Sequence, residues 1–188
     1  MLTPVARAQV LMTLDMWQFA EHANPDGTAI LNKFWCAALQ PVIIGLATIP
    51  RFLLGQCRFK NRKAGDPTRV EPWAWVVGAL CWLGASAIFT VCLYSLVEFI
   101  WDEGTPPEDN LRRQDARTIT ALALVQVGYP VVSLYSYAYL HVFFPHWRAE
   151  GDTYPAHLSF QKDMAYAALD VTTKGGLAIY AASRAMWT

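Results

Sequence analysis

The sequence is poor in charged residues. Of its 188 residues, 15 are Lys or Arg and 15 are Asp or Glu, so charged residues make up 16% and the formal net charge is zero. Soluble domains average about 25% charged residues. The balanced charge argues against a nucleic-acid-binding protein, which needs a basic surface, and the 54% hydrophobic content excludes a disordered chain. The length corresponds to about one domain.

Familiar catalytic and metal-binding motifs are missing as well. The four cysteines include no C-x-x-C pair, and we interpret them as buried small hydrophobic residues. The four histidines lack the spacing of a local metal motif, so no metal site is predicted. The sequence has no Gly-rich phosphate loop and no G-x-S-x-G elbow. It therefore does not predict an enzyme.

What the sequence does contain is long runs without charge. Residues 34–50, 72–97 and 118–145 hold no Asp, Glu, Lys or Arg, and residues 164–187 are apolar apart from three charged side chains. A helix that crosses a bilayer needs about 20 mostly apolar residues. The pattern therefore predicts four transmembrane helices. Their expected ranges are 34–54, 73–98, 118–143 and 163–186.

The remaining segments complete the predicted architecture. Residues 1–24 predict a short amphipathic or partly buried helix that ends in a turn at Asn24-Pro25-Asp26-Gly27. Asp15 interrupts the apolar stretch, which argues against a signal peptide. Connectors are expected at 55–72, which is strongly basic, at 99–117 and at 144–162. We expect a single all-α domain over residues 1–188, an integral membrane protein surrounded by the lipid bilayer, in a membrane that the sequence does not specify.

Two charges lie in the middle of the fourth predicted span. Asp170 and Lys174 are four residues apart, which places them on one helix face with the acid nearer the N-terminus. Charges at bilayer depth are costly, so they usually face the protein interior and pair. One interpretation is an ion pair that only holds helices together. The other is a functional site, in which a lysine amine forms a Schiff base with an aldehyde and the aspartate is its counterion.

The residues around this pair resemble a known family. Leu169-Asp170-Val171-Thr172-Thr173-Lys174-Gly175-Gly176 is similar to the L-D-V-x-x-K-x-G pattern in the seventh helix of microbial (type 1) rhodopsins. Gly128-Tyr129-Pro130-Val131-Val132 resembles the A-Y-P-V-V of the sixth helix. Weaker similarities connect Trp73-Ala74-Trp75-Val76-Val77-Gly78 with the fifth helix and Leu2-Thr3-Pro4 with the third. The resemblance therefore runs from the late third helix through the seventh.

The resemblance implies a binding site for retinal. In that family the lysine carries retinal and the aspartate is one of its counterions, so Lys174 is expected to form the retinal Schiff base and Asp170 to balance its charge. The expected walls of the pocket are formed by Tyr129, Pro130, Trp75, Gly78 and Trp82.

Four positions depart from the family pattern, and one of them, Lys162, stands where the family often has a proton-release carboxylate. Gln126 and Ser133 stand where the family usually has aromatic rings that clamp the polyene. Gln9 stands at the position that donates a proton in outward pumps, and an amide does not titrate. The resemblance therefore implies a protein other than a standard proton pump.

Two functions remain as alternatives. The first is a light-responsive, retinal-binding membrane protein that acts as an ion transporter, a channel or a photosensor. The second is a retinal-free, four-helix accessory or structural subunit of a larger membrane complex, in which Asp170 and Lys174 pair with each other or with a neighbouring charge. In both cases we expect other membrane subunits or an oligomer as partners, because four helices do not enclose the pocket unaided.

Overall fold

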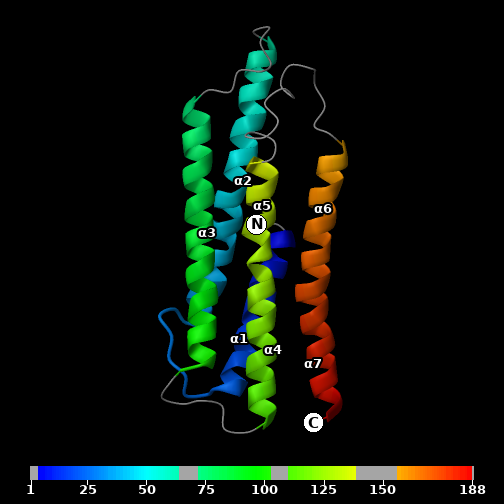
Figure 1. Cartoon of the computed structure of the whole chain (residues 1–188). Coiled ribbons are helices and arrows are strands. Elements are labelled where there is room, and N and C mark those ends of the chain that lie inside the picture. Colours follow the sequence, from blue (N-terminus) through cyan, green and yellow to red (C-terminus); the bar gives the residue numbers. More distant parts are fainter. Residues whose placement is uncertain (1–3, 64–71, 103–109, 139–155, 188) are drawn as a thin grey trace.

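The described part of the chain is an elongated bundle of helices (Figure 1). The computed structural model describes residues 4–63, 72–102, 110–138 and 156–187, and every regular element within these ranges is helical. This confirms the all-α expectation for the described residues. The helices are α1 (Pro4–Ala23), α2 (Lys33–Lys63), α3 (Pro72–Ile100), α4 (Asn110–Gln126), α5 (Gly128–Ala138), α6 (Ala156–Asp170) and α7 (Gly176–Trp187).

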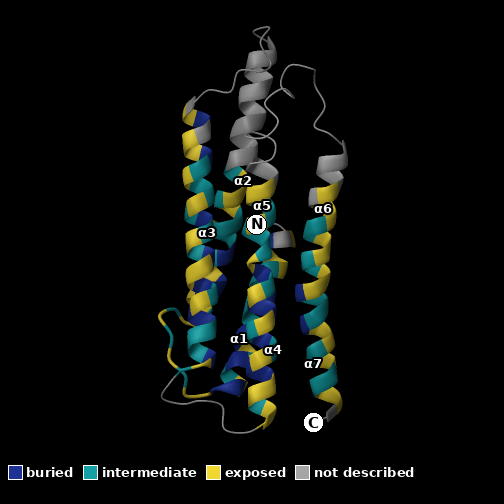
Figure 2. Ribbon diagram, in the orientation of Figure 1, coloured by how far each residue is buried: buried dark blue, intermediate teal, exposed yellow. Residues whose placement is uncertain are grey.

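Two helical segments are long and apolar enough to cross a membrane. They are Val76–Ile100 and Asn110–Tyr135, which overlap the second and third predicted spans. Within the described ranges, Lys33–Ile49 is also apolar but shorter. Exposed residues lie along the outer sides of the helices (Figure 2). Several of them are large and apolar, such as Leu80, Leu83 and Leu124, each more than half exposed.

Several helices extend beyond the predicted spans. The first part of the expected 55–72 loop is helical, because α2 continues to Lys63. Likewise, α4 begins at Asn110, inside the expected 99–117 connector, and α6 begins at Ala156, inside the expected 144–162 connector. The predicted loops are longer than the observed ones, because the prediction takes charged residues to mark the ends of helices. Lys, Arg, Gln and Leu are strong helix formers, so a helix can continue into a charged segment.

The third predicted span is divided into two helices. The helix α4 ends at Gln126 and α5 begins at Gly128, and the two run end to end (Figure 1). Pro130 causes the break, because it has no N–H to donate to the carbonyl of Gln126, four residues earlier. The backbone N–H of Val127 instead donates to the carbonyl of Leu124 at 3.1 Å. The predicted residues 139–143 of this span lie outside the described ranges.

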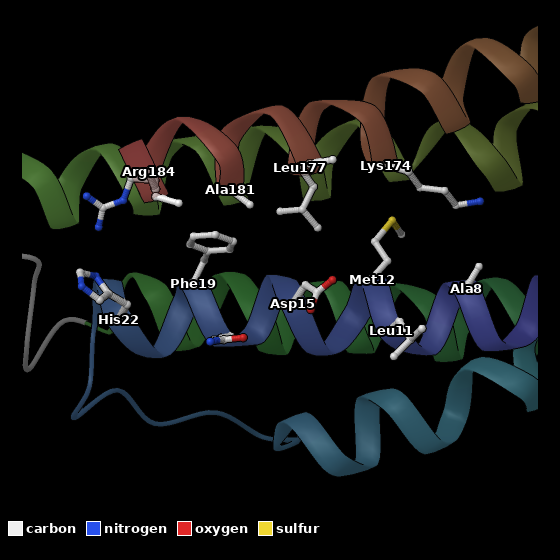
Figure 3. Close-up of a pocket in the computed structure, with 13 residues that line it drawn as sticks. Ala8, Leu11, Met12, Asp15, Phe19, His22, Lys174, Leu177, Ala181 and Arg184 are labelled. Carbon is white, nitrogen blue, oxygen red and sulfur yellow. The ribbon is translucent and has the colours of Figure 1, made fainter. Parts of the chain in front are cut away.

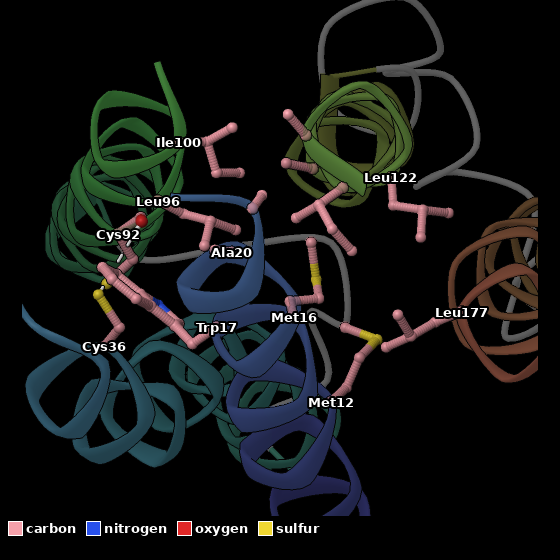
Figure 4. Packing of buried hydrophobic residues seen from close by; sticks show 14 residues of the cluster. Met12, Met16, Trp17, Ala20, Cys36, Cys92, Leu96, Ile100, Leu122 and Leu177 are labelled. Atoms are coloured by element: carbon pink, nitrogen blue, oxygen red, sulfur yellow. Dashed lines mark hydrogen bonds between the residues drawn. The ribbon is translucent and has the colours of Figure 1, made fainter. Parts of the chain in front are cut away.

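The N-terminal helix is central to the core. Its side chains Met12, Met16, Trp17 and Ala20 are each at most 4% exposed. They pack against α2, α3, α4 and α7 (Figure 4). The sequence predicted this helix as amphipathic or partly buried, and the structure confirms a helix over Pro4–Ala23. The partners supplied by the other helices are Cys36, Cys92, Leu96, Ile100, Ala116, Ile119, Leu122, Ala123 and Leu177.

The segment between α1 and α2 is attached to the end of α3. The turn predicted at Asn24 to Gly27 is present, with the N–H of Gly27 donating to the carbonyl of Asn24 at 3.3 Å. The Asn24 side chain donates to the carbonyl of Phe99 at 3.1 Å, and the N–H and hydroxyl of Thr28 donate to Asp102 at 2.9 and 2.7 Å. These bonds satisfy polar groups that would otherwise be left unpaired where the chain reverses.

Gly27 fits this turn because it has no side chain. A Cβ at this position would lie 2.3 Å from the carbonyl oxygen of Phe99. We therefore expect Gly27→Ala to lower the free energy of unfolding in detergent by about 1–3 kcal/mol through overpacking. Gly45→Ala is the matched control, because a Cβ at Gly45 meets nothing within 4 Å and alanine favours a helix. Thermal unfolding of both variants tests this, and equal midpoints would contradict it.

Candidate functional site

The predicted Asp170–Lys174 pair lies at an irregular point of its helix. A π-helical turn, Val171–Gly175, joins α6 to α7. Thr173 is 1% exposed within it, and its hydroxyl donates to the carbonyl of Leu169 at 2.7 Å. Single π-helical turns inside longer helices are frequent at functional sites. The Lys174 Nζ donates to Asp170 Oδ1 at 2.6 Å, so the two charges form an ion pair along the helix.

Tyr129 reaches the same carboxylate from the neighbouring helix α5. Its hydroxyl donates to Asp170 Oδ1 at 2.5 Å and lies 3.3 Å from the Thr173 hydroxyl. The ring of Tyr129 also stacks on that of Tyr166 from α6, with centroids 6.2 Å apart and an interplanar angle of 20°. One oxygen of the Asp170 carboxylate therefore accepts hydrogen bonds from both a cation and a phenol. Such charge-assisted bonds are among the stronger hydrogen bonds in proteins.

A cavity of about 350 Å³ opens beside this cluster. Its size falls within the roughly 300–1,000 Å³ range of pockets that hold small molecules. Helices α1, α2, α3, α5 and α6 line it, together with the π-helical turn. Most of its walls are apolar or aromatic, and its convergent polar groups include Tyr129, Asp170 and Lys174. An apolar pocket with a few converging polar groups is the usual form of a ligand site.

The structure brings most of the predicted site residues together. Trp82 and Pro130 line the cavity with Tyr129, Asp170 and Lys174. Gly78 is buried one turn before Trp82, and it is not among the lining residues. The side chain of Trp75 lies outside the described part of the structure.

The positions that depart from the family pattern lie in different places, and the side chain of one of them, Lys162, is outside the described part of the structure. Gln9 and Ser133 line the cavity. Gln126 is 3% exposed and is not among the residues that line it. Its side-chain amide donates to the Met16 sulfur at 2.9 Å, in the core around α1. Ser133, which is smaller than an aromatic residue, therefore leaves space at the cavity wall. Gln126 instead packs in the core beside α1.

Sequence reasoning missed several contributors to the site. Tyr166 precedes Asp170 by one helical turn, so the i, i+4 spacing of positions 166, 170 and 174 is a signal that was available. Phe89 and Gln40 come from α3 and α2, and no local pattern marks them as cavity residues. The indole N–H of Trp82 is buried and has no hydrogen-bond partner among the described residues.

A second polar cluster, which the sequence did not predict, lies at the other end of α7. The Asp115 carboxylate on α4 is fully buried and accepts hydrogen bonds from the Tyr180 hydroxyl and from Arg184 at 2.9 Å. His22 Nδ1 of α1 lies 3.1 Å from it. The cluster therefore connects α1, α4 and α7. A buried charge is costly unless it is paired and hydrogen-bonded, and here three side chains meet that requirement.

We expect Asp115→Asn to destabilise the bundle. The amide removes the negative charge that pairs with the nearly buried Arg184 guanidinium, which costs about 3 kcal/mol. Asp26→Asn is the control, since Asp26 is exposed in the turn after α1. Chemical unfolding in detergent, followed by circular dichroism, measures the difference. Equal stability of the two variants would show that the cluster contributes little.

Chemically, the first cluster combines an amine, a carboxylate and a phenol at the wall of an apolar cavity. A lysine amine in such surroundings can bond covalently to an aldehyde, and the carboxylate can balance the charge of the product. Comparisons with protein-family models, curated proteins and solved structures found no match for this chain.

Proposed function

We propose that the chain is a light-responsive, retinal-binding membrane protein of the microbial rhodopsin type. The observation that carries the proposal is the ion pair of Lys174 and Asp170, held by Tyr129 at the wall of a cavity that Trp82 and Pro130 also line. Lys174, Asp170, Tyr129 and Pro130 belong to the two motifs on which the family resemblance mainly rests, and Trp82 is expected in the pocket from the alignment. The output of the protein is ion transport, channel activity or photosensing.

The distribution of apolar side chains supports four membrane-spanning rods. We assign these to α2, α3, α4 with α5, and α6 with α7. Each carries exposed large apolar residues, for example Val42, Leu83, Val131 and Ile179. At 1.5 Å per residue, the helix from Ala156 to Trp187 is about 48 Å long, enough to cross the roughly 30 Å hydrocarbon core. In lipid these exposed side chains face a solvent as apolar as themselves.

The side chains at the cavity fit an aldehyde-bearing polyene. Retinal supplies absorption of visible light and isomerisation about its double bonds. The Lys174 amine would hold it by condensing with its aldehyde, so that a C=N bond forms and water is released. Asp170 is already positioned against the lysine nitrogen, 2.6 Å away, so it would balance a positive charge there. Tyr129 would keep the carboxylate oriented, and the rings of Trp82 and Tyr166 would contact the chain of the polyene.

Lys174→Ala tests the attachment directly. Membranes containing the native sequence and all-trans retinal should develop a visible absorption band that bleaches with hydroxylamine under illumination. Lys174→Ala should lose the band entirely, because it removes the only amine among the described residues that line the cavity. Lys33→Ala is the control, since Lys33 pairs with Glu21 away from the cavity. A band that persists in Lys174→Ala would exclude Lys174 as the site of retinal attachment.

Asp170→Asn tests the role of the carboxylate. A negative charge near the protonated nitrogen stabilises the ground state, in which the positive charge is localised there, more than the excited state. Removing it should shift the absorption maximum to longer wavelength. Asp163→Asn, on an exposed site two turns earlier, should leave the maximum in place. Spectra of the two variants measured at one pH decide the matter, and an unshifted band in Asp170→Asn would exclude Asp170 as the counterion.

An accessory subunit without retinal is the second candidate. The observation that favours it is the open groove between α1 and α7, which leaves Lys174 accessible from a second side. In this case Asp170 and Lys174 serve only to join α6 and α7 to α5 through Tyr129. The absence of any visible band in the native sequence after retinal addition would favour this candidate over the first.

A further inference from the structure

A groove of about 670 Å³ separates α1 from the last helix (Figure 3). On α1 its lining residues recur every three or four positions from Ala8 to His22, and on the last helix they recur in the same way from Lys174 to Ala185. This spacing is that of one helix face on each side. Each wall is therefore a complete helical stripe, and the α1 stripe is about 21 Å long at 1.5 Å per residue.

The surface of the groove is mostly apolar, and its walls carry small residues. Ala178, Ala181 and Ala185 line one side, and Ala8 lies on the other. Small residues at such positions allow another helix backbone to approach closely, which is how helices associate within membranes. The α1 stripe includes one exposed large apolar side chain, that of Leu11, which is 60% exposed.

One charge in the groove has no counterion among the described residues. Lys174 at one end pairs with Asp170, and Arg184 at the other end pairs with Asp115. Asp15 lies between them, is exposed and lines the groove (Figure 3). In the part of the chain that the structure describes, no cation forms an ion pair with it. A carboxylate at bilayer depth is costly unless it is paired. We therefore expect a cation to bind near the middle of the groove.

We propose that this groove receives one further membrane-spanning helix from a partner chain, with a Lys or Arg side chain at the depth of Asp15. A helix fits the two parallel stripes, and its basic residue would neutralise the carboxylate. A lipid acyl chain would fill the space but carries no cation at that depth. The proposal rests on the membrane assignment made above and is independent of retinal.

A synthetic helix provides the test. The full chain is reconstituted into phosphatidylcholine vesicles together with a dansyl-labelled Leu/Ala peptide of about 20 residues that carries one central Lys. An otherwise identical peptide carries Leu at the centre. Energy transfer from the tryptophans of the chain to the dansyl group reports binding. Asp15→Asn removes the proposed counterion, and Asp26→Asn removes an exposed charge outside the groove.

We expect the native chain to bind the Lys peptide about tenfold more tightly than the Leu peptide, the scale of polar contacts between membrane helices. Asp15→Asn should abolish this preference, and Asp26→Asn should keep it. Ala181→Leu narrows the groove and should weaken both peptides, whereas Ala182→Leu, exposed and outside the lining residues, should not. Equal binding of the two peptides, a preference that survives in Asp15→Asn, or unchanged binding in Ala181→Leu would each overturn the proposal.

Its failure is distinguishable from that of the proposed function. A chain that alkaline carbonate washes off the vesicles contradicts the membrane assignment and with it this proposal. A chain that stays in the vesicles but shows no preference contradicts only the docking of a basic helix. The visible absorption band reports on retinal separately in both cases.

Discussion

The pairing of charges at the wall of an apolar cavity is the constraint on which the arrangement of the site depends. Asp170 and Lys174 neutralise each other at 2.6 Å, and Tyr129 adds a bond to the same carboxylate oxygen from another helix. Both side chains are only partly buried, and the apolar cavity wall beside them makes a paired charge less costly than an unpaired one. The contact therefore fixes α6 against α5, and it places the lysine nitrogen at the wall of the cavity.

Two charged clusters hold the last helix, one near each end. The cluster at Asp170 joins it to α5, and the cluster at Asp115 joins it to α4 and to His22 of α1. Between them the last helix contacts the core through Leu177. The face between these two anchors that looks toward α1 is the one that forms the groove (Figure 3). The contacts at Asp170 and Asp115 thus hold the last helix against α5 and α4, and its side toward α1 lines the groove.

The backbone is irregular at two points near the site, the break between α4 and α5 and the π-helical turn before α7. Pro130 interrupts the hydrogen bonding of the long helix and separates α4 from α5, just before the cavity wall. Gly128 lies at this break, and a Cβ there would lie 2.6 Å from the Leu169 side chain. The helices α5 and α6 can therefore approach closely enough for Tyr129 to reach Asp170. On the other helix, the π-helical turn spans the residues from Val171 to Gly175, including Lys174.

The sequence by itself determined the all-helical architecture, two apolar segments long enough to cross a membrane and the shared face of Asp170 and Lys174, because each depends on residues close together along the chain. The sequence also predicted that Tyr129 and Trp82 lie in one pocket with Lys174, but only through the resemblance to microbial rhodopsins. The tertiary structure alone decided that α1 is central, that Asp115 is buried among Tyr180, Arg184 and His22, and that Gln126 faces the core. Periodicity defines the face of a helix, but the packing of segments far apart in the chain decides what that face meets.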